Sequence, residues 1–288
     1  MKELRGVGVA LATPLNEDYS IDYAGLERLV NHVNRHTDYL VVLGTTGESP
    51  VFTWKEKLRI LEFVIKTNDA RKPVVFGLGG NDTFDLISKS KELKDYPLAA
   101  ILSASPYYSR PSQEGIIRHF EMLGDEYPHP IILYNVPART ASNMEADTTL
   151  KLAEHPNIVA MKEASCDLRQ CKEIIDNQPD DFVFLSGDDA FTLELLKSGA
   201  HGVISVVANA LPSQFSEMVQ AGLSGRLEEA TELNKALQNA YELASAEGNP
   251  SSIKGALEVL NICRRKVKPP LFNASDQLIE QWKKFTDR

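Results

Sequence analysis

Cysteine is scarce in this 288-residue sequence, which contains three: Cys166, Cys171 and Cys263. Their number and spacing form neither an even disulfide framework nor the paired Cys-x-x-Cys pattern of a metal site. We interpret them as reduced thiols, which favours a cytoplasmic protein. The sequence also lacks an apolar run long enough to cross a bilayer, so no membrane partner is expected.

Basic runs are absent as well, and the formal net charge is -9. Proteins that bind nucleic acid need clustered lysine and arginine to displace phosphate counterions, so no nucleic-acid partner is expected. Lys2 and Arg5 precede the apolar stretch 7–15 as in a signal peptide, but Glu3 and interspersed glycines favour a first strand instead.

Short apolar runs alternate with segments of helical periodicity through the first 225 residues. Such runs, each followed by a helix, are typical of a parallel sheet covered by helices. Eight strand–helix units predict a (β/α)8 barrel, and an open doubly wound sheet is the alternative. The first run is not followed by G-x-G-x-x-G, which disfavours a dinucleotide-binding open sheet. We expect strands at residues 7–12, 39–43, 74–78, 98–102, 131–134, 158–161, 182–185 and 202–206.

The helical patterns complete the expected architecture. Within the barrel they cover residues 21–36, 54–67, 83–94, 113–124, 145–154, 168–177, 190–197 and 211–221. Beyond residue 225 the strand pattern ends, and residues 227–246, 252–264 and 276–285 have helical periodicity. The sequence therefore predicts a catalytic barrel at 1–225 and a C-terminal helical domain at 226–288.

Lys162 follows the apolar run 158–161 directly. Lysine is rarely buried unless it is paired or chemically used. Desolvation favours the neutral amine, which can attack a carbonyl to form a Schiff base. Taken alone, a strand-end lysine whose ammonium reaches water is the commoner alternative.

Other unusual segments also follow expected strands, at the end where a (β/α)8 barrel places its active site. They are GTTGES at 44–49, SPYYSRP at 105–111, YNVPART at 134–140 and GDDA at 187–190. The glycines and hydroxyls of GTTGES can bring donors to a carboxylate, although the segment also fits a tight turn with a threonine cap.

Three tyrosines and two arginines lie in these segments, and we single out Tyr107, Tyr108, Tyr134 and Arg139 as candidates. Beside a Schiff-base lysine, phenols can shuttle protons, and an arginine can grip a substrate carboxylate. The alternatives are ordinary buried aromatics and a surface salt bridge.

Three further features have plainer interpretations. GLGG at 77–80 lacks the GK[ST] of a nucleotide loop and is read as a strand-end turn. Asp188 and Asp189 have no histidines at matching ligand spacing, so we expect a helix N-cap and no metal site. Glu163 should point to the strand face opposite Lys162.

Together these segments resemble the pyruvate-dependent class I aldolase family, and within it the dihydrodipicolinate synthases. The resemblance spans essentially the whole chain and is carried by GTTGES, PYYSRP, YNVPART, MKEAS, SGDDA, GVISV at 202–206, and NP followed by KGALE at 254–258. It implies a (β/α)8 barrel with a C-terminal helical domain. It also implies condensation of pyruvate with L-aspartate 4-semialdehyde, without a metal or organic cofactor.

The resemblance implies a catalytic set as well. Lys162 forms the Schiff base with pyruvate, while Thr45, Tyr108 and Tyr134 form a proton relay. In the family the tyrosine matching Tyr108 is donated across a tight dimer interface, and the expected assembly is a homotetramer built as a dimer of dimers. A catalytically silent protein that binds a small keto acid or a partner is an alternative of a different class.

The resemblance assigns the substrates too. Thr46 and the backbone of Ile204 would hold pyruvate, and Arg139 would receive the carboxylate of the semialdehyde. Sialic acid lyases and other sugar-acid aldolases share the lysine and typically lack this arginine. They are the alternative activity.

Ser49, Asn81 and Tyr107 match parts of the site at which some members of the family are inhibited by lysine. Lys57 stands where inhibited members usually have histidine, and Asp85 where they have glutamate. Because a cation at position 57 repels the ammonium group of lysine, we expect weak or absent inhibition.

Overall fold

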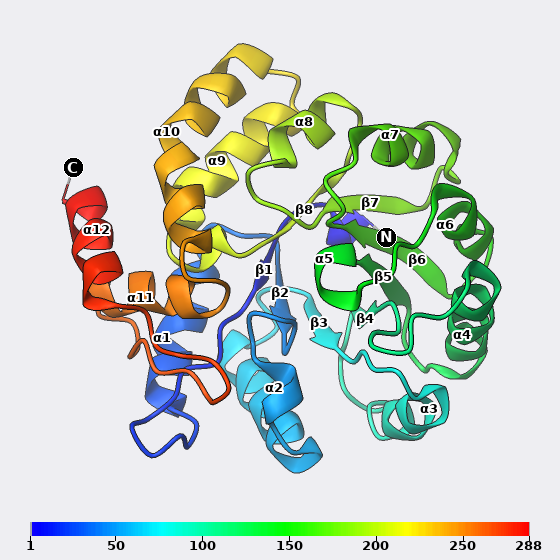
Figure 1. The fold of residues 1–288 in the computed structure, drawn as a ribbon, viewed down its shortest axis with the longest axis horizontal. Coiled ribbons are helices and arrows are strands. Elements are labelled where there is room, and N and C mark those ends of the chain that lie inside the picture. The colour runs from blue at the N-terminus through cyan, green and yellow to red at the C-terminus, as the bar shows by residue number, and fades with distance from the viewer. Residues whose placement is uncertain (1, 288) are drawn as a thin grey trace.

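The computed structural model describes residues 2–287. Eight parallel strands in this range close into a barrel, in which each strand pairs with the next and β8 pairs with β1 (Figure 1). The expected (β/α)8 barrel is therefore confirmed. The strands are β1 Gly6–Ala10, β2 Tyr39–Val42, β3 Val74–Gly77, β4 Ala100–Ala104, β5 Ile131–Asn135, β6 Ile158–Glu163, β7 Val183–Ser186 and β8 Gly202–Ser205.

Each expected helical segment corresponds to a helix, with ends that shift by a few residues. The α-helices are α1 Tyr23–Val33, α2 Trp54–Asn68, α3 Thr83–Lys91, α4 Gln113–Glu126, α5 Pro137–Thr140, α6 Ala146–Ala153, α7 Leu168–Asn177, α8 Thr192–Lys197, α9 Pro212–Leu223, α10 Leu227–Ser245, α11 Ser251–Val259 and α12 Asp276–Thr286. Short 3-10 helices are η1 Lys2–Leu4, η2 Ser49–Val51 and η3 Val207–Asn209. The sequence did not predict α5, which is a single turn.

Two apolar cores lie on opposite faces of the barrel strands. The larger packs the outer faces against the helices and includes Met161, while the smaller fills the barrel interior and includes Ala160. Successive side chains of a strand point to opposite faces. Because Ala160 points inward, Lys162 points inward as well, and Glu163 shares the outer face of Met161.

Local sequence explains where two of the helices begin and end. Thr53 and Glu56 form a capping box at the start of α2. The pattern predicted that the helix after residue 252 would reach residue 264, but α11 ends at Val259. Asn261 adopts a left-handed backbone conformation with φ of 55°, which is incompatible with continuing the helix.

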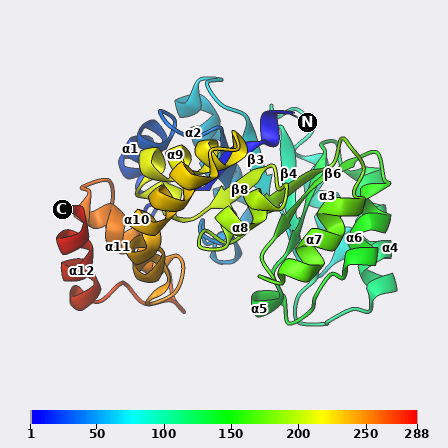
Figure 2. The same cartoon turned by 90° about the horizontal axis from the view of Figure 1, so that it is seen from above.

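Helices α10, α11 and α12, here called the C-terminal helices, lie together on one side of the barrel (Figures 1 and 2). Helix α10 packs along α9, and α11 contacts both α12 and η3, the turn that follows β8. The C-terminal helices therefore reach the end of the barrel at which the sequence places its active site. Within residues 2–287, none of the helices combines the length and the apolar character needed to span a bilayer.

Candidate active site

Lys162 and Tyr134 form the centre of the candidate site. They occupy paired positions on neighbouring strands, β6 and β5. Lys162 is 5% exposed, and its Nζ lies 4.4 Å from the centre of the Tyr134 ring. Within residues 2–287 its ammonium takes part in none of the ion pairs. A buried lysine with no carboxylate partner fits chemical use better than a structural salt bridge.

Glu163 points away from Lys162, as expected. Its carboxylate accepts hydrogen bonds from Asn135 Nδ2 at 3.0 and 3.1 Å, Gln170 Nε2 at 3.1 Å and the Ser165 backbone N–H at 2.6 Å. Burial raises the pKa of this carboxyl, and these hydrogen bonds oppose the shift. Because Asn135 follows Tyr134, the Asn135–Glu163 contact ties β5 to β6 just outside the Tyr134–Lys162 pair.

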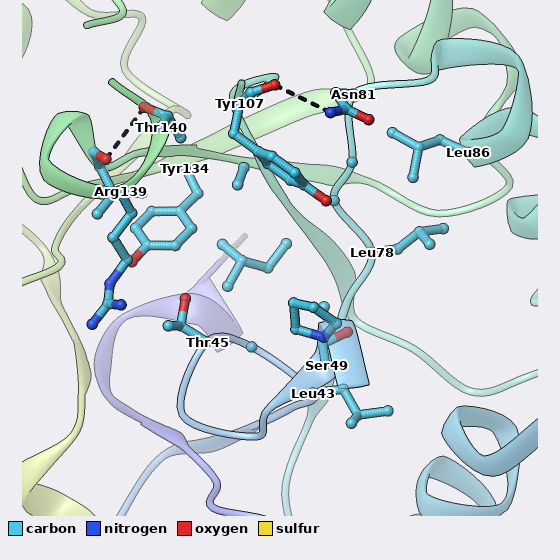
Figure 3. A pocket seen from close by; sticks show the side chains of 18 of the residues that line it. Leu43, Thr45, Ser49, Leu78, Asn81, Leu86, Tyr107, Tyr134, Arg139 and Thr140 are labelled. Carbon is cyan, nitrogen blue, oxygen red and sulfur yellow. Dashed lines mark hydrogen bonds between the residues drawn. The ribbon is translucent and has the colours of Figure 1, made fainter. Parts of the chain in front are cut away.

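A cavity of about 500 Å³ opens beside Tyr134. Figure 3 shows Thr45, Tyr134 and Arg139 around this cavity together with Ser49, Asn81 and Tyr107. The structure therefore brings residues predicted for catalysis and residues predicted for regulation to one connected space. Lys57 and Asp85 also line it.

The remaining predicted residues occupy different positions. Thr46 and Ile204 are buried and, like Lys162, are not among the side chains that line the cavity. Ile204 belongs to the barrel interior. Tyr108 is 91% exposed and does not line the cavity. Residues 2–287 therefore leave this tyrosine almost fully exposed.

Arg139 projects from α5, the turn that the sequence did not predict. Val136 precedes Pro137, which starts the helix with no N–H to satisfy, and the Arg139 backbone N–H donates to the Val136 carbonyl at 2.9 Å. The exposed guanidinium forms no ion pair within the described part of the chain. It is therefore free to meet an anionic ligand at the cavity.

The two aspartates after β7 accept hydrogen bonds from different backbone segments. Asp188 Oδ1 accepts the Phe191 N–H at 3.0 Å, before α8. Asp189 Oδ2 accepts the N–H groups of Val206 and Val207, at 3.0 and 2.8 Å, where η3 begins. The predicted helix N-cap was wrong, because the N-cap residue of α8 is Phe191 and this helix has no side-chain cap. Asp188 instead accepts the N–H of Phe191 itself, and Asp189 holds the loop after β8. No cluster of three potential metal ligands occurs among residues 2–287.

Gly77, the last residue of β3 and the first of the glycine-rich segment 77–80, is required by close packing. A Cβ at this position would lie 2.3 Å from the Leu43 carbonyl oxygen, so only glycine lets β3 approach the segment before GTTGES. The glycine-rich segment thus lies at the end of β3, as predicted, but residues 78–80 form no regular turn.

Asn249 makes a contact with the candidate site that the sequence did not predict, since this residue was considered only within the NP motif. Its Nδ2 donates to Thr46 Oγ1 at 3.0 Å, across 203 residues of sequence. Its Oδ1 is buried without a hydrogen-bond partner among the described residues. A polar residue at a loop end gave no signal of this distant contact.

A (β/α)8 barrel whose sixth strand carries a buried lysine, beside a tyrosine that shares a cavity with a threonine and an arginine, defines a lyase of the class I aldolase type. The chain belongs to the dihydrodipicolinate synthetase family, whose model matches residues 3–287. A curated 4-hydroxy-tetrahydrodipicolinate synthase of Flavobacterium psychrophilum is 41% identical over 288 residues, which cover 99% of this chain and 98% of the relative.

Solved structures agree with this assignment. Dihydrodipicolinate synthase from Aquifex aeolicus has a TM-score of 0.94 at 35% identity, covering 99% of this chain and 97% of that one. A structure described as the first monomeric dihydrodipicolinate synthase variant has a TM-score of 0.96 at 32% identity, covering 99% and 96%. The sugar-acid aldolase alternative is therefore not favoured.

Proposed function

We propose that this chain catalyses the 4-hydroxy-tetrahydrodipicolinate synthase reaction of lysine and diaminopimelate biosynthesis, in which pyruvate condenses with L-aspartate 4-semialdehyde. The observation that carries the proposal is the buried, unpaired Lys162 within residues 2–287, with its Nζ 4.4 Å from the ring centre of Tyr134. Membership of the family supports the same reaction.

The reaction begins when the neutral Lys162 amine attacks the keto carbon of pyruvate. Loss of water gives an iminium, and loss of a methyl proton gives an enamine whose carbon attacks the aldehyde. The amino group of the semialdehyde then attacks the iminium carbon, which closes the ring and releases Lys162. Lys162 thus serves as the electron sink, and we propose that neither a metal nor an organic cofactor takes part.

The surrounding residues take the roles that their chemistry suits. Thr45, Tyr108 and Tyr134 would carry the protons that carbinolamine formation and dehydration require. Thr46 and the backbone of Ile204 would hold the pyruvate carboxylate. The exposed guanidinium of Arg139 would bind the carboxylate of the semialdehyde, for which its planar fork is suited.

The exposure of Tyr108 supports a role in the active site of a second subunit rather than in its own. A phenol that is 91% exposed is poorly placed to relay protons within its own chain. We propose that it enters the site of a second subunit and that the assembly is a homotetramer. Because a related structure is described as a monomeric variant, the assembly of this chain has to be measured. Mass measured in solution at several concentrations tests this proposal.

The division at residue 225 and the cytoplasmic location stay predictions. Limited proteolysis would test the first, because a domain boundary falls where few contacts protect the chain. Fractionation of the native cell would test the second.

Two assays test the reaction. With purified protein, pyruvate consumption should be fast with L-aspartate 4-semialdehyde and slow with N-acetylmannosamine or a simple sugar aldehyde. Turnover only with a sugar aldehyde would contradict the synthase assignment while keeping the lysine chemistry. Borohydride added with pyruvate should leave a reduced adduct on Lys162, and labelling at another lysine would contradict its role.

A further inference from the structure

A buried ion pair joins the loop 44–49 to the C-terminal helices. Glu48 lies in that loop and Lys254 lies on α11, and their side chains are 1% and 0% exposed. Lys254 Nζ donates to Glu48 Oε1 and, at 2.7 Å, to the Lys266 carbonyl. Glu48 Oε2 accepts the Lys268 backbone N–H at 2.8 Å. Both charged groups are thus paired inside the protein, although 206 residues separate them in the sequence.

Stability alone is a poor explanation for this pair. Removing two charges from water is costly, and apolar side chains of similar volume often serve a core equally well. The neighbours of Lys254 on α11, Ile253 and Leu257, are themselves buried in the main apolar core. What an ion pair adds is a fixed relative geometry, because its hydrogen bonds are directional.

The geometry that it fixes is that of the loop. Glu48 has a left-handed backbone with φ of 56°, a conformation unfavourable for a residue with a Cβ. Its N–H donates to the Thr45 carbonyl at 3.1 Å, closing a turn around Thr46. Asn249 donates to Thr46 Oγ1 in the same turn. The segment that carries the C-terminal helices therefore contacts this loop at both Thr46 and Glu48.

We propose that Lys254, acting through Glu48, is a positioning residue that holds loop 44–49 in the conformation in which Thr45 faces the cavity. That the substrate bound beside this loop is pyruvate rests on the proposed function. The C-terminal helices thereby govern the first half of the reaction, although none of their described residues lines the cavity. The inference rests on the burial of Glu48 and Lys254, and on the observation that Lys254 reaches the loop from a helix that does not line the cavity.

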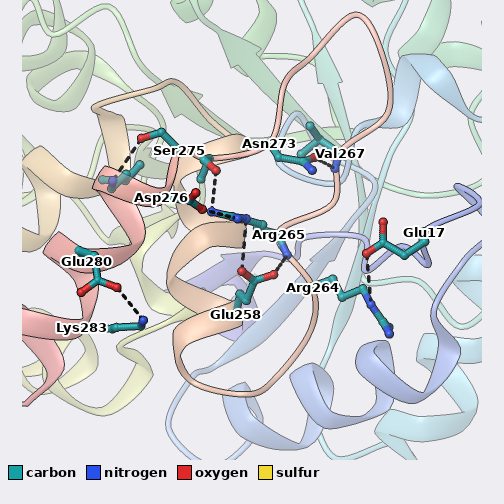
Figure 4. A network of polar contacts seen from close by, with 12 residues as sticks. Glu17, Glu258, Arg264, Arg265, Val267, Asn273, Ser275, Asp276, Glu280 and Lys283 are labelled. Carbon is teal, nitrogen blue, oxygen red and sulfur yellow. Dashed lines mark hydrogen bonds and ion pairs between the residues drawn. The ribbon is translucent and has the colours of Figure 1, made fainter.

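The test compares variants of this pair with a matched control. Glu48→Gln keeps the shape of the side chain, and Lys254→Met keeps most of its length. The control is Arg265→Met, because Arg265 binds Glu258 of α11 and Asp276 of α12 (Figure 4). Among residues 2–287, none of its hydrogen bonds or ion pairs reaches loop 44–49. For each protein we would measure borohydride trapping of pyruvate, KM for both substrates, the melting temperature, and hydrogen exchange in peptides covering the loop.

We expect Glu48→Gln and Lys254→Met to slow pyruvate trapping and raise pyruvate KM by about tenfold or more, since small misplacements of binding groups are costly. KM for the semialdehyde should stay within about twofold, because its proposed contact, Arg139, lies elsewhere. Hydrogen exchange should rise in loop 44–49. Arg265→Met should leave trapping within about twofold even where its melting temperature falls equally.

Equal loss of trapping in Arg265→Met, at an equal fall in melting temperature, would overturn the proposal, as would wild-type trapping in both pair variants. If a single variant fails to fold, the double variant Glu48→Gln/Lys254→Met leaves no unpaired charge and should show the same slow trapping. Absence of trapping in the wild-type protein would contradict the proposed function instead. Hydrogen exchange would then decide the positioning role: a rise confined to loop 44–49 in the pair variants supports it, and no difference from Arg265→Met overturns it.

Discussion

The candidate active site has a buried inner side, whose residues are all held by a single chain, and an exposed outer side, whose residues are not. On the inner side, Lys162 and Thr46 are buried, and Thr46 is bonded to Asn249. On the outer side, Tyr108 is almost fully exposed and Arg139 projects from a helix of one turn. The groups proposed to bind and activate pyruvate are thus fixed by the fold. Tyr108, proposed to relay protons, and Arg139, proposed to bind the second substrate, instead depend on a partner subunit and on the substrate itself.

The largest effect should come from the inner side. Replacing Lys162 with alanine removes the nucleophile, so turnover should fall by at least about 10³-fold and pyruvate should no longer be trapped by borohydride. Lys172→Ala is a suitable control, because Lys172 is exposed and paired with Asp176 on α7. Residual trapping of pyruvate in the Lys162→Ala protein would show that another lysine forms the Schiff base.

Substitutions of Tyr134 and Tyr108 allow the inner and outer sides to be compared directly. Tyr134→Phe and Tyr108→Phe should each lower turnover by about 10²-fold, the usual contribution of a proton-transfer group. They should differ when each is mixed with Lys162→Ala under conditions that exchange subunits. If Tyr108 serves a partner's site, a dimer of one Tyr108→Phe subunit and one Lys162→Ala subunit contains one complete site. Random pairing of equal amounts should therefore restore about a quarter of the wild-type number of sites.

Mixing Tyr134→Phe with Lys162→Ala should restore nothing, because both residues belong to one chain's site. Recovery in both mixtures, or in neither, would contradict the division between the two sides. The same assay run at falling protein concentration should show activity lost on dilution.

Much of the inner side could be predicted from the sequence, because it follows local rules. The apolar run before Lys162 predicted a strand that ends at the lysine, and the period of two along a strand predicted that Glu163 points to the opposite face. The structure shows that the face of Lys162 is the inner one. Other features depend on contacts that no local pattern encodes. Glu48 and Lys254 meet only after α11 has folded back onto the barrel rim, and Asp189 reaches across to η3.

The outer side was harder to predict for a different reason. Helix α5 has four residues, too few for any helical periodicity to appear in the sequence. The full exposure of Tyr108 likewise has no signature in its own segment, because an aromatic residue in a loop is equally compatible with a buried position. Resemblance to a family, rather than periodicity, assigned Tyr108 its role.

The stability of the fold should also respond to pH, through Asp189 at the loop after β8. Burial, with the nearby charge of Asp188, raises the pKa of Asp189 from 3.8 to about 6. The folded protein therefore binds this proton more tightly than the unfolded chain, so the stability that Asp189 contributes is lost as pH rises from about 4 to 6, by up to about 3 kcal/mol. Melting temperatures of wild type and Asp189→Asn should change relative to each other in this window. If the melting temperatures of the two proteins changed with pH in parallel, the raised pKa of Asp189 would be contradicted.

The smallest effect concerns the outer part of the cavity, where Lys57 faces Asp85 and Lys89. Burial and the charge of Lys89 lower the pKa of Lys57, while Asp85 opposes the shift. A lysine ligand would place a further cation here, so the wild-type protein should be inhibited weakly or not at all. Lys57→His removes most of this charge at neutral pH and should strengthen inhibition by about tenfold, a change of roughly 1.4 kcal/mol. Turnover without lysine present should stay the same. Strong inhibition of the wild-type protein in a lysine titration would contradict this electrostatic account and show that Asp85, Ser49 and Asn81 outweigh the repulsion.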